Sequence, residues 1–419
     1  SQSGASMTDQ PASPPKLKRS LTLLPLTLYG LGTTIGAGIY ALIGEMALVA
    51  GYQMPVSFLI AAALATLTGF SFVELSSRYP KAAGEAVYVQ QGFDRRWLTI
   101  VVGLLAVSAG TVSAASIVNG FVGYLQSFTD IHRTIIIVAL MLGMTVVAAW
   151  GIGSSVAAAA ILTVIEIGGL AIVIAAGGEH LADLPARINE FVPTFDAGMW
   201  AGIFAGSFLA FYAFIGFEDI VNMAEETKDP TRVVPWAIIL TLAVTAVLYV
   251  LVSVVALLSV PLSELAGSAA PLKLVYARAT GSSGALIGVI GILAMVNGAL
   301  IQLIKGARVL YGLSRQGVLP AWFGQVNART STPLNATLLV GAAIFILALW
   351  FRLGGLAQAT SLITLGVFSL VNLALVRVKL RDDPVDHTAI FNIPIWIPLG
   401  GFAVSAGFLL TKLVQLASG

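Results

Sequence analysis

The chain has 419 residues, of which 58% are hydrophobic and only 10% are charged, and its mean hydropathy is +0.93. A water-soluble core cannot hide so much apolar surface, so the composition excludes a soluble domain and predicts a protein of the lipid bilayer. The net charge of +2 gives no indication of a nucleic-acid partner, and the absence of cysteine excludes disulfides and thiolate metal sites.

The first 20 residues are polar and rich in proline, and they lead into Lys16, Lys18 and Arg19. This pattern predicts a disordered cytoplasmic N-terminal tail over residues 1–20 and no signal peptide. Residues 1–6, ahead of Met7, are interpreted as a remnant of an expression vector. The rest of the chain, 21–419, is predicted to form a single polytopic domain.

Apolar runs of about 20 residues, the length that crosses a hydrocarbon core of about 30 Å, follow one another along this domain. They are apolar on every face, which excludes the alternating pattern of barrel strands and predicts an all-α membrane protein. We predict eleven membrane-spanning helices, over residues 21–51, 55–79, 97–126, 134–150, 154–178, 199–226, 235–260, 284–313, 334–351, 355–378 and 393–415.

The loops between these helices carry an uneven distribution of positive charge. Placing the N-terminus in the cytoplasm gathers most lysines and arginines on that side, and the odd number of helices then puts the C-terminus outside. Six cations remain outside: Arg133, Arg187, Lys273, Arg278, Arg352 and Lys412. The sequence therefore predicts a multi-pass protein of the inner or plasma membrane.

Two of the predicted helices are interrupted near the middle of the membrane. The first contains GTTIGAGIY from Gly32 to Tyr40, and the sixth contains FYAFIGFE from Phe211 to Glu218. The interruptions lie five helices apart, which indicates two halves of opposite topology, repeat one over 21–178 and repeat two over 199–380, with an extra helix at 393–415. Matching interruptions in inverted repeats are typical of secondary transporters and mark their substrate site.

A broken helix in hydrocarbon frees backbone groups that need polar partners. In the first helix, the N–H groups of Ala37, Gly38 and Ile39 begin the outer half and suit a carboxylate, which Gly36 and Gly38 allow to approach closely. Freed carbonyl groups suit an ammonium group, and the candidates are Thr34, Ile35, Tyr212, Ala213 and Ile215. A ligand with both groups on one carbon atom is an α-amino acid. The competing interpretation is that these glycines serve close helix packing.

Side chains beside the interruptions are further candidates. Phe211, Tyr212 and Phe214 are predicted as gates over the substrate and walls of its side-chain pocket, or alternatively as ordinary packing aromatics. Ser108, Thr111 and Ser113 on the third helix could face the site, although small polar residues in membrane helices often bind a neighbouring backbone.

Glu166, Glu218 and Lys305 are charges inside predicted spans and are candidates for ion coupling, because such charges are costly in a membrane. Lys305 could instead extend towards the interface. Glu74 and Glu85, near Arg78 and Lys81, are predicted as structural ion pairs of an inner gate. The histidines fall in separate predicted loops, at His132, His180 and His387, so we predict no metal site.

Four stretches together carry a family resemblance: GTTIGAGIY, FVELSSRYPKAAGEAVYV (72–89), FYAFIGFE followed by AEETKDPTRVVP (224–235), and RVLYGLSRQGVLP (308–320). They resemble the amino acid/polyamine/organocation (APC) superfamily of permeases, and within it bacterial relatives of the cationic amino acid transporters. The resemblance rests on specific motifs over about residues 21–330 and on the helix pattern beyond.

This resemblance implies the leucine-transporter-type fold, in which two intertwined five-helix repeats give alternating access to a central amino-acid site. In several proton-coupled relatives a lysine on the fifth helix takes the place of a sodium ion. The matching position here, in LTVIEIGGL, is Glu166, which reverses the charge.

We therefore predict a secondary amino-acid transporter, either proton-coupled or exchanging, with a small-molecule substrate and no cofactor. A neutral amino acid is the first expectation, because the inferred pocket contains Ala37 and Ala213. A cationic amino acid or a polyamine is the alternative if Glu166 or Glu218 faces the ligand. An enzyme would need a nucleophile, a metal cluster or paired acids on one face, and the sequence has neither cysteine nor clustered histidines. A channel would need a continuous polar stripe, which the sequence does not show.

Overall fold

A computed structural model describes residues 19–81, 84–150, 156–330, 332–381 and 391–418. The predicted tail up to residue 18, His387 and the side chain of Ala37 lie outside the part of the chain that it describes.

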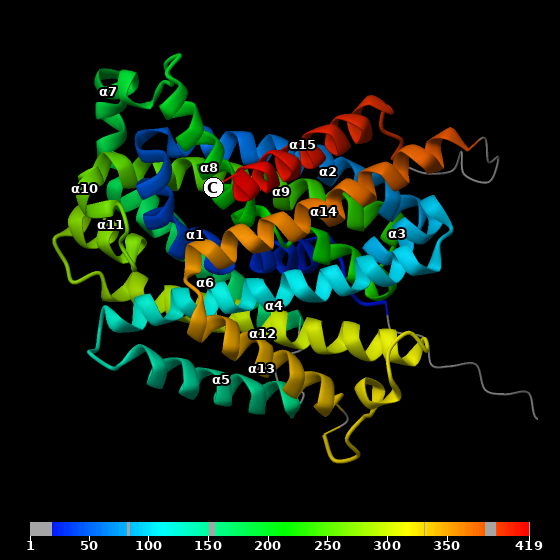
Figure 1. Ribbon diagram of the computed structural model, residues 1–419. Helices are drawn as coiled ribbons and strands as arrows, with labels where there is room; N and C mark the ends of the chain where they lie inside the picture. Colours follow the sequence, from blue (N-terminus) through cyan, green and yellow to red (C-terminus); the bar gives the residue numbers. More distant parts are fainter. Residues whose placement is uncertain (1–18, 82–83, 151–155, 331, 382–390, 419) are drawn as a thin grey trace, which may run out of the picture.

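Long helices account for most of the described chain (Figure 1). They are α1 (Leu23–Ala50), α2 (Met54–Arg78), α4 (Arg96–Gln126), α5 (Arg133–Ala149), α6 (Val156–Gly177), α8 (Ala197–Phe214), α9 (Pro230–Ser259), α12 (Ala285–Arg315), α13 (Leu334–Trp350), α14 (Leu353–Leu380) and α15 (Trp396–Ser418). Each coincides with one of the predicted apolar runs. Within the described residues the only β pairing is a single bridge, between Leu21 and Thr227.

Short helices connect the long ones. They are η1 (Gly51–Gln53), α3 (Gly84–Phe93), η2 (Gly178–Asp183), α7 (Leu184–Phe191), η3 (Phe217–Glu226), α10 (Leu262–Leu265), α11 (Pro271–Thr280) and η4 (Ala321–Gly324). Of these, α3 and η3 help to build the site described below.

Eight segments of the described chain are long and apolar enough to cross a membrane, and the first of them contains both α1 and α2. The apolar helices α5 and α13 are shorter, at 17 residues each. At a rise of about 1.5 Å per residue, 17 residues span about 26 Å, slightly less than a hydrocarbon core. That the chain crosses the membrane eleven times therefore stays a prediction.

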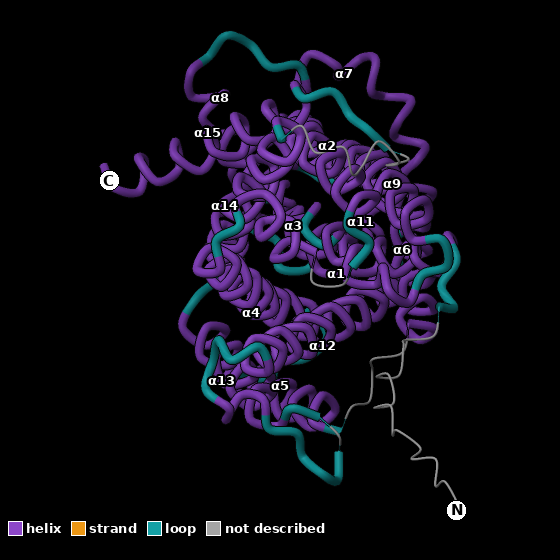
Figure 2. Tube along the Cα trace, turned by 90° about the vertical axis from the view of Figure 1, so that its right-hand side faces the viewer, coloured by secondary structure: helices purple, strands orange, loops and turns teal. Residues whose placement is uncertain are grey.

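Helices α1, α2, α8 and α9 pack together in the interior. Helices α4, α12 and α14 lie beside them. In Figure 2, which looks roughly along the bundle, α5 and α13 lie outside α4 and α12, and α15 lies on the opposite side next to α2 and α14. Four of the five pairs of helices in corresponding positions of the two predicted halves pack against each other: α1 with α8, α2 with α9, α4 with α12, and α5 with α13. The five-plus-five repeat itself stays a prediction.

Both predicted interruptions are present in the backbone. In α1, Gly36 leaves the helical conformation, with φ 4° and ψ −131°. The predicted sixth helix, 199–226, is divided into α8, which ends at Phe214, and the 3₁₀ helix η3, which begins at Phe217. Gly216 lies between them with φ 131°, a conformation that favours glycine. We call the interruption at Gly36 the first break and that at Ile215–Gly216 the second break.

The backbone before α1 is joined to the end of η3. Leu21 donates its N–H to the carbonyl of Glu226 at 3.0 Å, and its own carbonyl accepts from Lys228 at 2.9 Å. These hydrogen bonds tie the first helix of one predicted half to the broken helix of the other, so the two breaks are held in a common framework.

Candidate functional site

The two breaks meet in the interior, where α1 packs against α8 and η3. Thr33 donates its hydroxyl to the carbonyl of Gly216 at 3.0 Å. The hydroxyl of Tyr249, on α9, lies 3.0 Å from the carbonyl oxygen of Thr34 and 2.7 Å from that of Ala213. The single hydroxyl hydrogen of Tyr249 can thus be donated to a carbonyl group at either break, which satisfies part of the backbone that the interruptions free.

A small cavity of about 20 Å³ lies beside the breaks, and we call it the central cavity. Its walls come from the first break, from the second break and from α4 and α12. The lining residues are Thr33, Thr34, Gly36 and Gly38 of α1, Ser113 and Ile117 of α4, Tyr212 and Ile215 at the second break, and Gly298, Ile301 and Gln302 of α12. Its lining therefore carries no charged side chain.

Five of the predicted site residues line this cavity: Thr34, Gly36, Gly38, Tyr212 and Ile215. The hydroxyl of Tyr212 lies 3.3 Å from that of Ser113, which also lines the cavity. Tyr212 thus faces the cavity, and its role as a gate stays a prediction.

Other predicted site residues lie outside the lining. The side chains of Ile35, Ile39 and Ala213 are buried in the hydrophobic core. Phe211 packs edge-on against Phe368 at 5.8 Å between ring centroids, and Phe214 packs against Tyr249 at 5.1 Å. The packing alternative therefore describes Phe211 and Phe214 better than the prediction of walls or gates, because their rings face neighbouring helices.

The predicted carbonyl set also needs correction. The carbonyls of Thr34 and Ala213 lie within hydrogen-bond distance of Tyr249, and that of Tyr212 accepts from the N–H of Ile215 at 3.2 Å. These carbonyl groups therefore have partners within the protein. Those of Ile35 and Ile215 remain as candidates for a ligand.

Gly36 and Gly38, predicted to play the same role, differ in their surroundings. A Cβ atom added at Gly36 would meet no atom within 4 Å, whereas one at Gly38 would lie 2.8 Å from the Cα of Ala213. Gly38 therefore serves the close approach of α1 to α8, which was the competing interpretation, while Gly36 faces open space beside the first break.

The three charges predicted inside spans do not form one cluster. Lys305 is ion-paired with Asp219 of η3, with 22% of its side chain exposed, so it neither extends to the interface nor neutralises Glu166. Glu166 lies on α6 with 1% exposure. One of its carboxylate oxygens accepts from Asn297 at 3.4 Å, and the other is buried without a hydrogen-bond partner in the described chain.

Glu218 supports the second break. Its carboxylate accepts the N–H of Gly216 at 2.8 Å, so it satisfies a backbone donor that the interruption frees. The same side chain lines a second small cavity, of about 20 Å³, which we call the α3 chamber.

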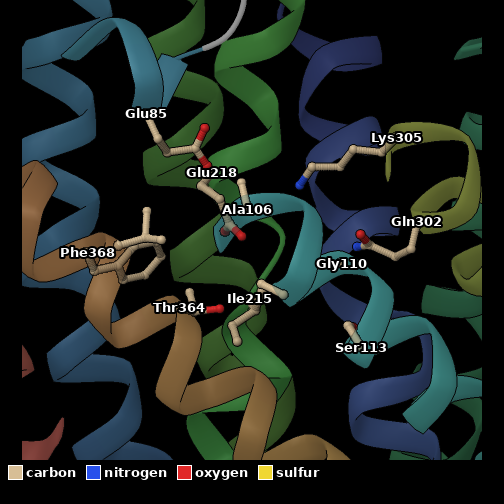
Figure 3. Close-up of a pocket in the computed structure, with 12 residues that line it drawn as sticks. Glu85, Ala106, Gly110, Ser113, Ile215, Glu218, Gln302, Lys305, Thr364 and Phe368 are labelled. Atoms are coloured by element: carbon tan, nitrogen blue, oxygen red, sulfur yellow. The ribbon is translucent and has the colours of Figure 1, made fainter. Parts of the chain in front are cut away.

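The wall of the α3 chamber comprises Glu85 of α3, Ala106, Ala109, Gly110 and Ser113 of α4, Ile215 and Glu218 at the second break, Gln302 and Lys305 of α12, and Thr364, Val367 and Phe368 of α14. Figure 3 shows Glu85 and Glu218 on one side of it, with Lys305 and Gln302 across from them.

The predicted pairing of Glu74 and Glu85 with Arg78 and Lys81 holds in part. Glu74 is fully buried and pairs with Arg78 at 2.6 Å and with Lys379 at 2.8 Å, so it joins α2 to α14. Glu85 forms no ion pair among the described residues and faces the α3 chamber instead.

Sequence reasoning missed Tyr249, Gln302, Asn297 and Asp219. A signal existed for Gln302, which lies three residues before Lys305 on α12 and so on a neighbouring position of the same helix face. A signal existed for Tyr249 as well, because it lies four residues after Thr245 and four before Ser253, so these polar residues share one face of α9.

Comparison with known proteins adds independent evidence. Residues 21–416 match the amino acid permease family. The branched-chain amino acid permease BcaP of Bacillus subtilis (strain 168) is 29% identical over 93% of this chain and 86% of its own length. Cationic amino acid transporter 4, vacuolar, of Arabidopsis thaliana is 31% identical over 89% of this chain, which spans only 65% of that protein.

An uncharacterized transporter of Mycobacterium tuberculosis (strain ATCC 25618 / H37Rv) is 33% identical over 88% of this chain and 82% of its own length. These relatives are named as permeases and transporters, which agrees with the predicted APC resemblance and the prediction that the chain is not an enzyme. Together with the apolar helices, they identify a multi-pass membrane protein. The chain belongs to the amino acid permease family, as its match over residues 21–416 shows.

Proposed function

We propose that this chain is a secondary active transporter that binds an α-amino acid in the central cavity and carries it across the membrane by alternating access. The observation that carries the proposal is the convergence of two broken helices on one cavity, with open space at Gly36. The names of the relatives support it, since they include a branched-chain amino acid permease and cationic amino acid transporters.

In this proposal the substrate carboxylate binds the N–H groups that begin the outer part of α1, after Gly36. A helix N-terminus carries positive dipole character and unpaired N–H groups, which favour an anion. The substrate ammonium group binds the carbonyls of Ile35 and Ile215, because those of Thr34 and Ala213 have Tyr249 as a partner. Ser113 and Tyr212 complete the wall on the α4 side.

Access alternates by movement between the two predicted five-helix repeats. The contacts between corresponding helices, such as α1 with α8 and α2 with α9, are those expected of inverted repeats that enclose a common site. The α3 chamber adjoins the central cavity and would provide its route to the side of the membrane on which α3 lies, predicted to be cytoplasmic.

Transport is coupled to protons or to exchange, and Glu166 is the candidate proton carrier. It is buried between α6 and α12, and one of its carboxylate oxygens has no partner in the described chain. Its only side-chain hydrogen bond here comes from neutral Asn297, so no neighbouring cation fixes its charge. Protonation can therefore change the α6–α12 contact without breaking an ion pair.

Purified protein in liposomes tests the proposal. Saturable counterflow of a labelled amino acid supports a carrier, whereas unsaturated conductance would indicate a channel. A thermal-shift screen with all common amino acids and amines finds the ligand, because a ligand at 100 times its dissociation constant adds about 2.7 kcal/mol to the stability of the folded state. The absence of both ligand stabilisation and counterflow would refute the proposal.

Glu166→Gln tests the coupling separately, because glutamine imitates the protonated carboxyl group at nearly constant volume. We expect the variant to bind and exchange substrate but to lose accumulation driven by a proton gradient. If it still concentrates substrate on that gradient, Glu166 is not the proton carrier.

A further inference from the structure

The α3 chamber is lined by charged and polar side chains that are not needed to bind the carboxylate and ammonium groups of an amino acid. It shares Ser113, Ile215 and Gln302 with the central cavity, so the two spaces adjoin through a common wall. A side chain of a substrate held at the breaks could extend into it. The chemistry of its wall therefore bears on which side chain is transported.

Acidic groups outnumber basic ones around the chamber. Glu85 and Glu218 line it, and Lys305 is the one basic side chain in its described lining. Lys305 is already ion-paired with Asp219, which lies behind the wall. Glu218 accepts only a backbone N–H, from Gly216, and Glu85 has no ion-pair partner among the described residues. The two lining carboxyl groups thus have no countercharge of their own.

Two further polar groups in the wall are buried and unpartnered. The side-chain oxygen of Gln302, a residue with 7% exposure, and the hydroxyl of Thr364, a residue with 4% exposure, make no hydrogen bond in the described chain. Both residues belong to the wall drawn in Figure 3. Unpaired buried polar atoms are costly, so a ligand that donates hydrogen bonds would relieve that cost.

We propose that the α3 chamber receives the cationic end of the substrate, so that the transported class is amino acids with an ammonium or guanidinium side chain. This inference rests on the proposed function. The carboxyl groups of Glu85 and Glu218 supply opposite charge, while Gln302 and Thr364 supply neutral oxygen acceptors. Burial raises the pKa of the Glu85 carboxyl group and the ammonium group of Lys305 only partly offsets this, as expected of an acid that lacks its own countercharge.

The neutral amino acid favoured by composition fits this chamber less well. The described lining of the central cavity is uncharged, so it offers no opposite charge to a charged side chain. An apolar side chain placed in the α3 chamber would face the carboxyl groups of Glu85 and Glu218 and leave the oxygens of Gln302 and Thr364 without partners. Desolvated polar groups of this kind discriminate strongly between ligands.

Lysine and norleucine make the sharpest pair of probes, because norleucine is lysine without its terminal amino group. Inhibition of counterflow in liposomes gives the affinity of each. We expect lysine to bind at least tenfold more tightly than norleucine. Glu85→Gln and Glu218→Gln should each lower the affinity for lysine at least tenfold and change the affinity for norleucine by less than twofold. Glu225→Gln, an exposed acid on the same η3 segment, is the matched control and should change neither affinity.

The outcomes separate this inference from the proposed function. Equal affinity for lysine and norleucine, or equal weakening of both by the two variants, overturns the cationic chamber and leaves the amino-acid transporter intact. The absence of binding of any amino acid overturns both. If Glu218→Gln fails to fold because Glu218 supports Gly216, Glu85→Gln decides the matter, since Glu85 supports no broken backbone among the described residues.

Discussion

The two breaks look alike in sequence, yet the folded chain treats them differently. At the second break the freed backbone is occupied by side chains: Glu218 accepts the N–H of Gly216, Thr33 donates to the carbonyl of Gly216, and Tyr249 approaches the carbonyl of Ala213. At the first break, Gly36 faces open space within the central cavity. The second break is thus held by several side chains, whereas the first leaves space beside Gly36.

The contrast shows that an interrupted membrane helix does not by itself identify a binding group. Freed N–H and C=O groups can be satisfied from within the protein, and only those left beside a cavity are available to a substrate. Substitutions near the second break should therefore reduce stability, whereas substitutions near the first should reduce binding. Four variants test this division, in order of the stability effect expected.

Asp219→Asn should have the largest effect on stability. It leaves the ammonium group of Lys305 without its ion-pair partner in a largely buried position, which costs about 3–5 kcal/mol for a fully buried pair and somewhat less here, since 22% of Lys305 is exposed. Denaturant unfolding in detergent measures this loss of stability. Glu264→Gln, which breaks the exposed pair with Arg278, should cost below about 1 kcal/mol. Equal losses in the two variants would contradict a supported second break.

Gly216→Ala should reduce stability by about 1–3 kcal/mol. Its φ of 131° is rarely adopted by other residues, and an added Cβ would lie 2.5 Å from the carbonyl oxygen of Thr33. Gly355→Ala, where a Cβ meets nothing within 4 Å, is the control and should be neutral or slightly stabilising. A Gly216→Ala protein as stable as the parent would show that the second break tolerates rearrangement.

Tyr249→Phe should cost about 1 kcal/mol, because it removes the hydroxyl that lies beside the carbonyls of both Thr34 and Ala213. Those carbonyls would then be free beside the cavity. We expect the variant to alter substrate affinity as well as the unfolding midpoint. A change in neither quantity would mean that water replaces the hydroxyl without consequence.

Gly36→Ala should have the smallest effect on stability of the four, because an added Cβ meets no atom within 4 Å. The methyl group would instead occupy space in the central cavity next to the N–H groups proposed to bind the carboxylate. Amino-acid affinity, measured by thermal shift or counterflow, should fall at least tenfold. Unchanged affinity in a folded Gly36→Ala protein would remove the first break from the site.

Gly38 shows how far sequence reasoning extends at this site. From sequence, Gly36 and Gly38 are equivalent, since both lack a Cβ near an interruption. In the folded chain a Cβ at Gly38 would lie 2.8 Å from the backbone of Ala213. A Gly38→Val variant is therefore expected to disturb the packing of α1 against α8, and loss of binding in it would not distinguish a binding role from a packing role.

The sequence by itself determined the solvent, the positions of the long helices and the location of both breaks. Each follows from local properties: a run of about 20 apolar residues suits a bilayer wherever it lies, and a cluster such as GTTIGAG weakens a helix regardless of its neighbours. The motifs around Phe72–Val89 and Arg308–Pro320 added the family, which the match over residues 21–416 confirms.

Only the tertiary structure decided which side chains face the cavities. In a soluble protein an apolar stripe shows which face of a helix points inward, but a helix that is apolar all round has no such stripe. Thus Tyr212 lines the central cavity while Phe211 and Phe214 pack in the core, Lys305 pairs with Asp219, and Glu85 turns towards the α3 chamber. These partners lie on different helices, and their pairing depends on how α3, η3 and α12 pack together, which no local pattern encodes.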